Sequence, residues 1–91
     1  MPTSSQKEAT TRAIALGGGP SAVAREFQIR RPWAVSKWVK AGKVPADRVP
    51  DLVRLIDYKV TPHELLPEVY QYPDDGLPPE VRERMFGQKA A

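Results

Sequence analysis

The sequence contains no cysteine, which excludes disulfide bonds and metal sites built from thiolates. Its single histidine, His63, has neither a cysteine nor a second histidine with which to share a metal ion. No apolar run approaches the roughly 20 residues that span a bilayer, and the stretch MPTSSQKEATTR lacks the basic and apolar regions of a signal peptide. We therefore expect a cytoplasmic protein that neither crosses a membrane nor holds a metal.

The chain also lacks the residue patterns that catalysis requires. Its 91 residues make one domain with a modest core, which leaves little room for a large active-site cleft. The glycine-rich stretch LGGGPS precedes a predicted helix, but no strand leads into it, as a phosphate-binding loop would require. Asp74 and Asp75 lie in a proline-rich segment and are typical of a solubilising turn rather than an acid–base pair. We expect a protein that is not an enzyme and needs no cofactor.

What the chain does contain is positive charge, and most of it lies in one half. Residues 1–44 carry eight basic and two acidic side chains, a net charge of +6, whereas residues 45–91 carry six basic and nine acidic ones, a net charge of −3. Such a concentration of basic side chains is typical of a surface that meets a polyanion. The alternative is that these charges are scattered over a solvated surface.

Helix signals recur along the chain, whereas the alternation of a β-strand is scarce. The sequence predicts five helices, over residues 6–16, 20–27 and 32–41, over the stretch RVPDLVRLI that Asp47 can cap, and over PHELL. Ser5 with Glu8, and Thr61 with Glu64, have the spacing of capping boxes. The expected fold class is therefore all-α.

Beyond Tyr72 the pattern changes. The stretch YPDDGLPPE holds three prolines and predicts an irregular connector, and PEVRERMF predicts a short helix in which Val81 faces Met85. We expect one folded domain over residues 4–72, followed by a proline-rich connector and a short, loosely attached segment over residues 73–91.

The helices predicted over 20–27 and 32–41 are joined by a short turn, and their apolar positions interlock. The inner positions are Val23, Ala24 and Phe27 on the first helix, and Val35, Trp38 and Val39 on the second. The opposite face of the second helix holds Trp33, Ser36, Lys37 and Lys40, with Arg30 and Arg31 just before its start. A DNA major groove admits one helix, and arginine, lysine, small hydroxyl and apolar groups read its base edges. This face therefore predicts contact with DNA.

The run GGGPSAVAREF…WAVSKWVKAGKVPADRVPDLVRLI…VTPHELLPEVY resembles the Cro-like helix-turn-helix proteins of the YdaS antitoxin type, which bacteria and their phages encode. The resemblance covers about residues 9–72. It implies a five-helix domain, similar to Cro and lambda repressor, that binds operator DNA, commonly as a dimer on an inverted repeat, and usually represses transcription. Gln28 stands where the turn of this family usually carries Gly, and the segment from Ile29 to Val35 is one residue longer than in most relatives.

By position, Pro20, Ser21 and Arg25 match the part of this family that rests on the phosphate backbone. The expected DNA-binding residues are therefore Ser21, Arg25, Arg30, Arg31, Trp33, Ser36, Lys37 and Lys40. The expected partners are double-stranded DNA and a second copy of the chain, at least on DNA.

Three alternatives remain open at this stage. Trp33 could turn inward, because burial usually wins for an aromatic side chain. Lys37, Lys40 and Lys43 could form a solvated helix face without a partner. The protein could also be an antitoxin-like interaction module that neutralises a toxin through its acidic half or its C-terminal segment, and DNA binding would then serve autoregulation.

Overall fold

Every regular element in residues 3–87, the part of the chain that the computed structural model describes, is a helix. The elements are α1 (Ser4–Leu16), α2 (Pro20–Glu26), α3 (Pro32–Ala41), a 3-10 turn (Ala46–Arg48), α4 (Val49–Leu55), α5 (Pro62–Leu65), α6 (Pro79–Arg82) and a π-helical turn (Glu83–Gly87). The all-α class is confirmed. This range holds six α-helices, namely the five of the predicted domain and the short helix predicted in the C-terminal segment.

α1 begins earlier than the sequence indicates. Thr3 is its N-cap, and the Oγ1 of Thr3 accepts a hydrogen bond from the backbone N–H of Gln6 at 3.0 Å. The capping box predicted for Ser5 and Glu8 is wrong, since Ser5 already lies within the first turn. Thr3 has the extended backbone that an N-cap requires, with φ −76° and ψ 166°.

Of the two other predicted caps, one is wrong and one is confirmed. Asp47 lies in the 3-10 turn and does not cap α4, which has no side-chain cap and carries Pro50 in its first turn, where one fewer amide needs a partner. The capping box of α5 is confirmed. The Oε1 of Glu64 accepts from the Thr61 N–H at 2.8 Å, and the Oγ1 of Thr61 accepts from the Glu64 N–H at 3.3 Å.

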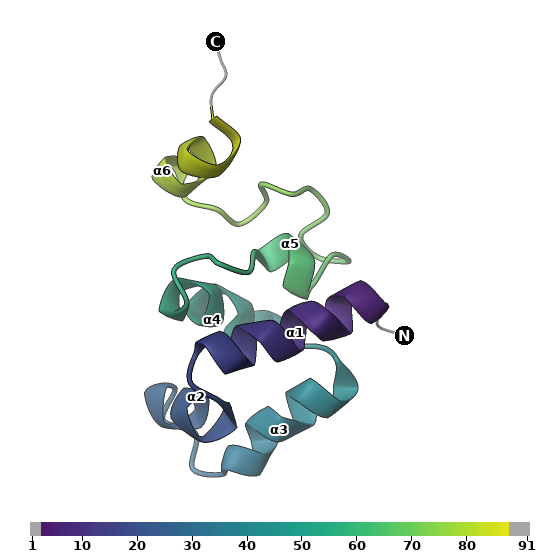
Figure 1. The fold of residues 1–91 in the computed structure, drawn as a ribbon, viewed down its shortest axis with the longest axis vertical. Helices are drawn as coiled ribbons and strands as arrows, with labels where there is room; N and C mark the ends of the chain where they lie inside the picture. Colours follow the sequence, from purple (N-terminus) through teal and green to yellow (C-terminus); the bar gives the residue numbers. More distant parts are fainter. Residues whose placement is uncertain (1–2, 88–91) are drawn as a thin grey trace.

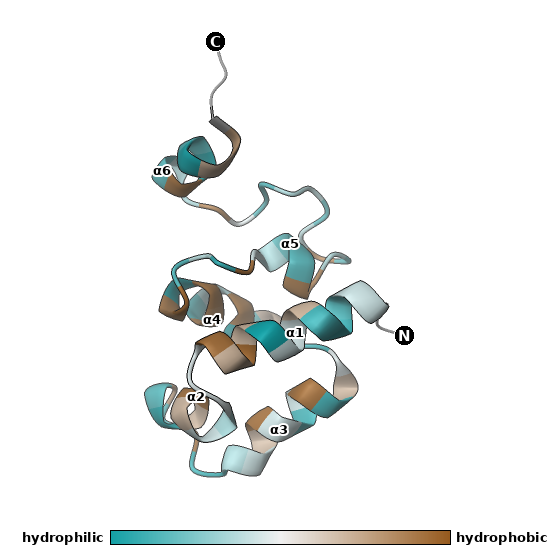
Figure 2. Cartoon of the chain, in the orientation of Figure 1, coloured by the Kyte–Doolittle hydropathy of each residue, from teal (hydrophilic) through white to brown (hydrophobic). Residues whose placement is uncertain are grey.

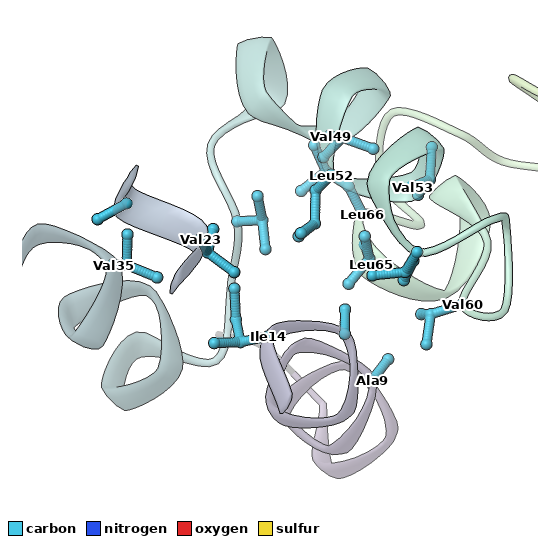
Figure 3. Close-up of a cluster of buried hydrophobic side chains, with 14 residues drawn as sticks. Ala9, Ile14, Val23, Val35, Val49, Leu52, Val53, Val60, Leu65 and Leu66 are labelled. Carbon is cyan, nitrogen blue, oxygen red and sulfur yellow. The ribbon is translucent and has the colours of Figure 1, made fainter. Parts of the chain in front are cut away.

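Side chains from α1 to α5 meet in one buried cluster between the helices (Figure 3). Its largest fully buried members are Ile14, Val23, Val35, Val44, Val49, Leu52, Val53, Val60, Leu65 and Leu66. In Figure 2 α4 is largely hydrophobic, whereas the turn from α2 into α3 is hydrophilic. The cluster therefore packs against the inner faces of α2 and α3, whereas Gln28, Arg30 and Arg31 of their connecting turn are exposed.

The C-terminal segment lies apart from this cluster. α2 and α3 lie at one end of the long axis and α6 at the other, with α1, α4 and α5 between them (Figure 1). The predicted helix PEVRERMF is present as α6 and the π-helical turn. Val81 is buried outside the main cluster, whereas Met85, which was expected to face it, is 44% exposed. No helix within residues 3–87 is long and apolar enough to cross a membrane.

Candidate nucleic-acid interface

α3 has the bounds that the sequence predicts, and local signals explain both ends. Pro32 occupies its first position, where a missing N–H costs nothing. Gly42 ends it with φ 73°, and the Gly42 N–H donates to the carbonyl of Trp38 at 2.8 Å. Between these ends Val35 is fully buried, and Trp38 packs partly buried against the core. The inner face of α3 is therefore the predicted one.

The turn before α3 is a Schellman motif that closes α2. The Ile29 N–H donates to the Ala24 carbonyl at 2.8 Å, and the Gln28 N–H donates to the Arg25 carbonyl at 3.1 Å. Gln28 has φ 57°, in the left-handed region that favours glycine. Gln28 is thus a strained position, and the turn through it leads the chain into α3.

All the residues predicted to bind DNA are exposed. They are Ser21, Arg25, Arg30, Arg31, Trp33, Ser36, Lys37 and Lys40. Trp33 is 54% exposed, so the inward alternative for this side chain is wrong. The helical repeat, which places Trp33 opposite Val35, outweighs the general tendency of aromatic side chains toward burial.

The basic side chains of this face have no carboxylate partner among the described residues. The ion pairs within residues 3–87 involve four other cations, namely Lys43, Arg54, Arg82 and Arg84. An unpaired cation keeps its full attraction for an external anion. The face formed by α3 and its preceding turn is therefore a positively charged surface without internal neutralisation.

The structure brings three of the predicted residues together in a way that the sequence did not indicate. The Cζ of Arg31 lies 5.8 Å from the centroid of the Trp33 ring, and the Nζ of Lys37 lies 5.4 Å from it. Both distances are within the range of a cation–π interaction. The only signal in the sequence is the spacing, since Lys37 follows Trp33 by one helical turn and Arg31 is the N-cap of α3.

Lys43 does not extend this face. Its Nζ lies 2.8 Å from the Oε2 of Glu68, and the hydrogen bond from Lys43 is the main cause that holds the pKa of Glu68 below its usual value. The Oε1 of Glu68 also lies 3.5 Å from the Nε2 of Gln6, which donates to the Leu65 carbonyl at 3.0 Å. Gln6 is 4% exposed. Through Glu68, Lys43 therefore links the end of α3 to the segment after α5 and to Gln6 of α1.

A concave region lies between the end of α2 and α4. This hollow of about 400 Å³ is lined by Glu26, Phe27, Gln28, Arg48, Asp51, Arg54 and Leu55. Its two cations already have contacts, because Arg54 pairs with Asp51 and the Cζ of Arg48 lies 5.7 Å from the ring centroid of Phe27. In residues 3–87 no three His, Asp or Glu side chains are grouped so as to hold a metal ion. The exposed face of α3 remains the best candidate site.

The family model described as the bacterial toxin YdaS matches residues 10–74. The chain belongs to the YdaS family. The YdaS part of the resemblance drawn from the sequence is thereby confirmed, and the family makes the chain a protein related to toxin–antitoxin systems. The family model is named for a toxin, whereas the motifs resemble the antitoxin-type members, so membership alone does not assign one of the two roles. Comparison with curated proteins and with solved structures gives no match.

The match to the YdaS family covers the elements that carry the candidate interface. Residues 10–74 include α2, the Schellman turn and α3, together with α4 and α5, which support them from the core. α6 lies outside the match. The exposed basic face is thus built on the part of this YdaS-family protein that it shares with its relatives.

Proposed function

We propose that this YdaS-family protein is a sequence-specific DNA-binding repressor with a Cro-like helix-turn-helix domain. In this proposal α3 enters the major groove and α2 rests on the phosphate backbone. The observation that carries the proposal is the exposed face of α3, whose basic residues have no carboxylate partner within residues 3–87. DNA binds such a face because each cation that contacts a phosphate releases counterions that were condensed on the DNA.

The residue types on this face suit both parts of DNA recognition. Arginine and lysine can donate to guanine or to phosphate, a serine hydroxyl can donate to or accept from a base edge, and an indole ring can lie against a thymine methyl group or a sugar. Lys37, Lys40 and Ser36 project from α3, while Ser21 and Arg25 lie on α2. In the proposed complex α3 reads bases, and the side chains of α2 fix its position.

Recognition by a dimer follows from the size of the interface. A single short helix contacts only a few base pairs, which gives little discrimination against the many non-specific sites of a genome. We therefore expect two protomers on an inverted repeat whose half-site centres lie about 34–36 Å apart, one turn of DNA.

Selection of bound sequences from a random duplex pool tests this function. We expect enrichment of an inverted repeat with this spacing. A pool without enrichment, or a single asymmetric half-site that binds one protomer, would contradict the proposal.

The salt dependence of binding tests the placement of α3. Substitution of both Arg30 and Arg31 by alanine should reduce the slope of log affinity against log salt by about 0.9 for each phosphate that the variant no longer neutralises, or relax base preference if the two arginines bind bases. The matched control replaces Arg82 and Arg84, which removes the same charge from the far end of the molecule and should leave slope and preference nearly unchanged. Equal effects of the two double variants would mean that α3 does not meet the DNA.

A second candidate function rests on the family itself. Because the family model is named for a toxin, a role in a toxin–antitoxin pair is the alternative, with a partner protein bound through the acidic half or the C-terminal segment. DNA binding would then serve autoregulation. Co-purification of a partner with the full chain, and its loss after deletion of residues 73–91, would support this function. Retention of the partner after the deletion would exclude the C-terminal segment as its binding site.

A further inference from the structure

The contacts around Trp33 indicate how the proposed DNA-binding site works, and this inference rests on the proposed function. Trp33 is a large aromatic side chain left 54% exposed, and two cations stand within 6 Å of its ring centroid. Neither Arg31 nor Lys37 has a carboxylate partner among residues 3–87. The contact that the structure records for both of these cations is the indole ring.

We propose that Trp33 is a positioning residue for DNA binding, which holds Arg31 and Lys37 in place before the DNA arrives. A free arginine or lysine side chain loses much rotamer freedom when it binds a phosphate or a base. A side chain that already lies over an indole ring has lost part of that freedom in the unbound protein. Binding to DNA is then stronger, although Trp33 adds no charge.

The backbone explains why one ring can serve both cations. Lys37 follows Trp33 by four residues in α3, and residues with this spacing are neighbours on a helix surface. Arg31 is the N-cap, with an extended backbone at φ −116° and ψ 103°, so its side chain leaves the chain just before the first helical turn. The ring of Trp33 thus lies within reach of one cation from inside the helix and one from its start.

Electrostatics make this arrangement suited to a polyanion. Two cations that share one ring repel each other, and the negative face of the indole offsets part of that repulsion. An approaching phosphate relieves the rest. We therefore expect the group formed by Arg31, Trp33 and Lys37 to favour the bound state even where the ring itself touches no base.

The decisive experiment is a set of binding measurements with a random-sequence duplex at several salt concentrations. Trp33→Leu keeps an apolar side chain and removes the ring, so affinity should fall by about 5-fold or more, the smallest loss expected when two long side chains are no longer pre-ordered. The salt slope should stay unchanged, because both cations remain. Trp33→Phe keeps an aromatic face and should recover part of the loss. Melting temperatures of the variants should agree, since exposed substitutions change stability little.

The same substitution in altered backgrounds separates positioning from direct contact. If Trp33 acts through the two cations, Trp33→Leu should cost almost nothing in a chain that also carries Arg31→Ala and Lys37→Ala. The Lys40→Ala background is the matched control, because Lys40 lies on the same helix without a recorded contact to the ring, and there the loss should persist. An equal loss in both backgrounds would overturn the inference and make Trp33 a direct DNA contact.

NMR of the free protein tests the premise without DNA. The side-chain protons of Arg31 and Lys37 should be shifted upfield by the ring current of Trp33, and Trp33→Leu should abolish the shift. Absence of the shift in the unaltered protein would overturn the inference whatever the DNA result. If the shift is present but no duplex binds, the contacts to the ring exist and the proposed DNA binding is wrong. The positioning role of Trp33 is then wrong as well.

Discussion

Lys43 and Glu68 form an ion pair, with the Nζ of the lysine 2.8 Å from the Oε2 of the carboxylate. The pair joins the residue after the C-cap of α3 to the segment after α5, and Gln6 of α1 lies beside it. A lysine in the basic half of the sequence is thereby used inside the protein rather than on the candidate interface. Its role is to fix the C-terminal end of α3 to the rest of the domain.

The first prediction follows from the lowered pKa of Glu68. Because the folded protein favours the carboxylate, the pair adds stability above the ordinary pKa of 4.5, and this contribution is lost as the pH falls through the lowered value. We expect Glu68→Gln to be less stable than the unaltered protein near neutral pH, by less than about 1 kcal/mol because both side chains are half exposed. The difference should vanish in acid.

Chemical denaturation at a series of pH values measures this difference. Glu8→Gln is the control, since Glu8 is exposed on α1 and belongs to none of the ion pairs within residues 3–87. A difference for Glu68→Gln that persisted in strong acid would show that the charge of Glu68 is not its source.

The second prediction concerns Lys37. Lys37→Ala should change the free energy of unfolding by no more than about 0.5 kcal/mol, because the side chain is exposed. It should weaken binding to a selected operator by about 1–3 kcal/mol if Lys37 reaches a base. Lys59→Ala removes the same charge from the turn after α4 and should leave binding unchanged. A lower melting temperature with unchanged binding would mean that Lys37 has a structural role.

The third prediction uses the Schellman turn. Gln28→Gly should raise the free energy of unfolding by about 0.5–1 kcal/mol, because glycine adopts the left-handed backbone at φ 57° without the steric cost that glutamine pays. Glu26→Gly, two residues earlier in the last turn of α2, should lower it by a similar amount, since glycine is a poor helix former. Thermal or chemical unfolding of both variants checks the opposite signs. A loss of stability for Gln28→Gly would mean that the glutamine side chain makes a contact worth more than the strain.

The fourth prediction concerns Gly42, at the other end of α3. A β-carbon there would collide with the Lys7 side chain, and the backbone is left-handed as well, with φ 73°. Gly42→Ala should therefore lower the free energy of unfolding by about 1–3 kcal/mol. In a Lys7→Ala background part of the cost should disappear, because the collision with the outer part of the lysine is removed. An identical cost in both backgrounds would assign the whole effect to the backbone.

The sequence predicts well those features that residues close together in the chain determine, such as helix ends and helix faces. The bounds of α3 follow from Pro32 and Gly42, and its inner and outer faces follow from the helical repeat. The capping box of α5 is confirmed for the same reason, because its partners are three residues apart. By contrast, Thr3 and Ser5 both carry a hydroxyl near the start of α1, so residue type alone could not choose between them.

What the sequence could not predict depends on residues far apart in the chain. The burial of Gln6 requires α5 to lie against α1, and the pairing of Lys43 with Glu68 requires the end of α3 to lie beside the segment after α5. The position of Trp33 was open because helical periodicity placed it outside while its aromatic character favoured burial. The burial of Val35 settles this, because a helix that turns Val35 into the core turns Trp33 outward.

The hydrogen bond from the Gln6 side chain to the Leu65 carbonyl also bears on how the protein is made. It joins residues 59 positions apart, so the carbonyl is synthesised about 3–12 s after the glutamine at ribosomal rates of about 5–20 residues per second. During that interval the inward side of α1, with Ala9 and Ala13, has no α5 to cover it. The inward side of α1 is therefore covered by α5 only after Leu65 has been translated, and the buried cluster cannot be completed before then.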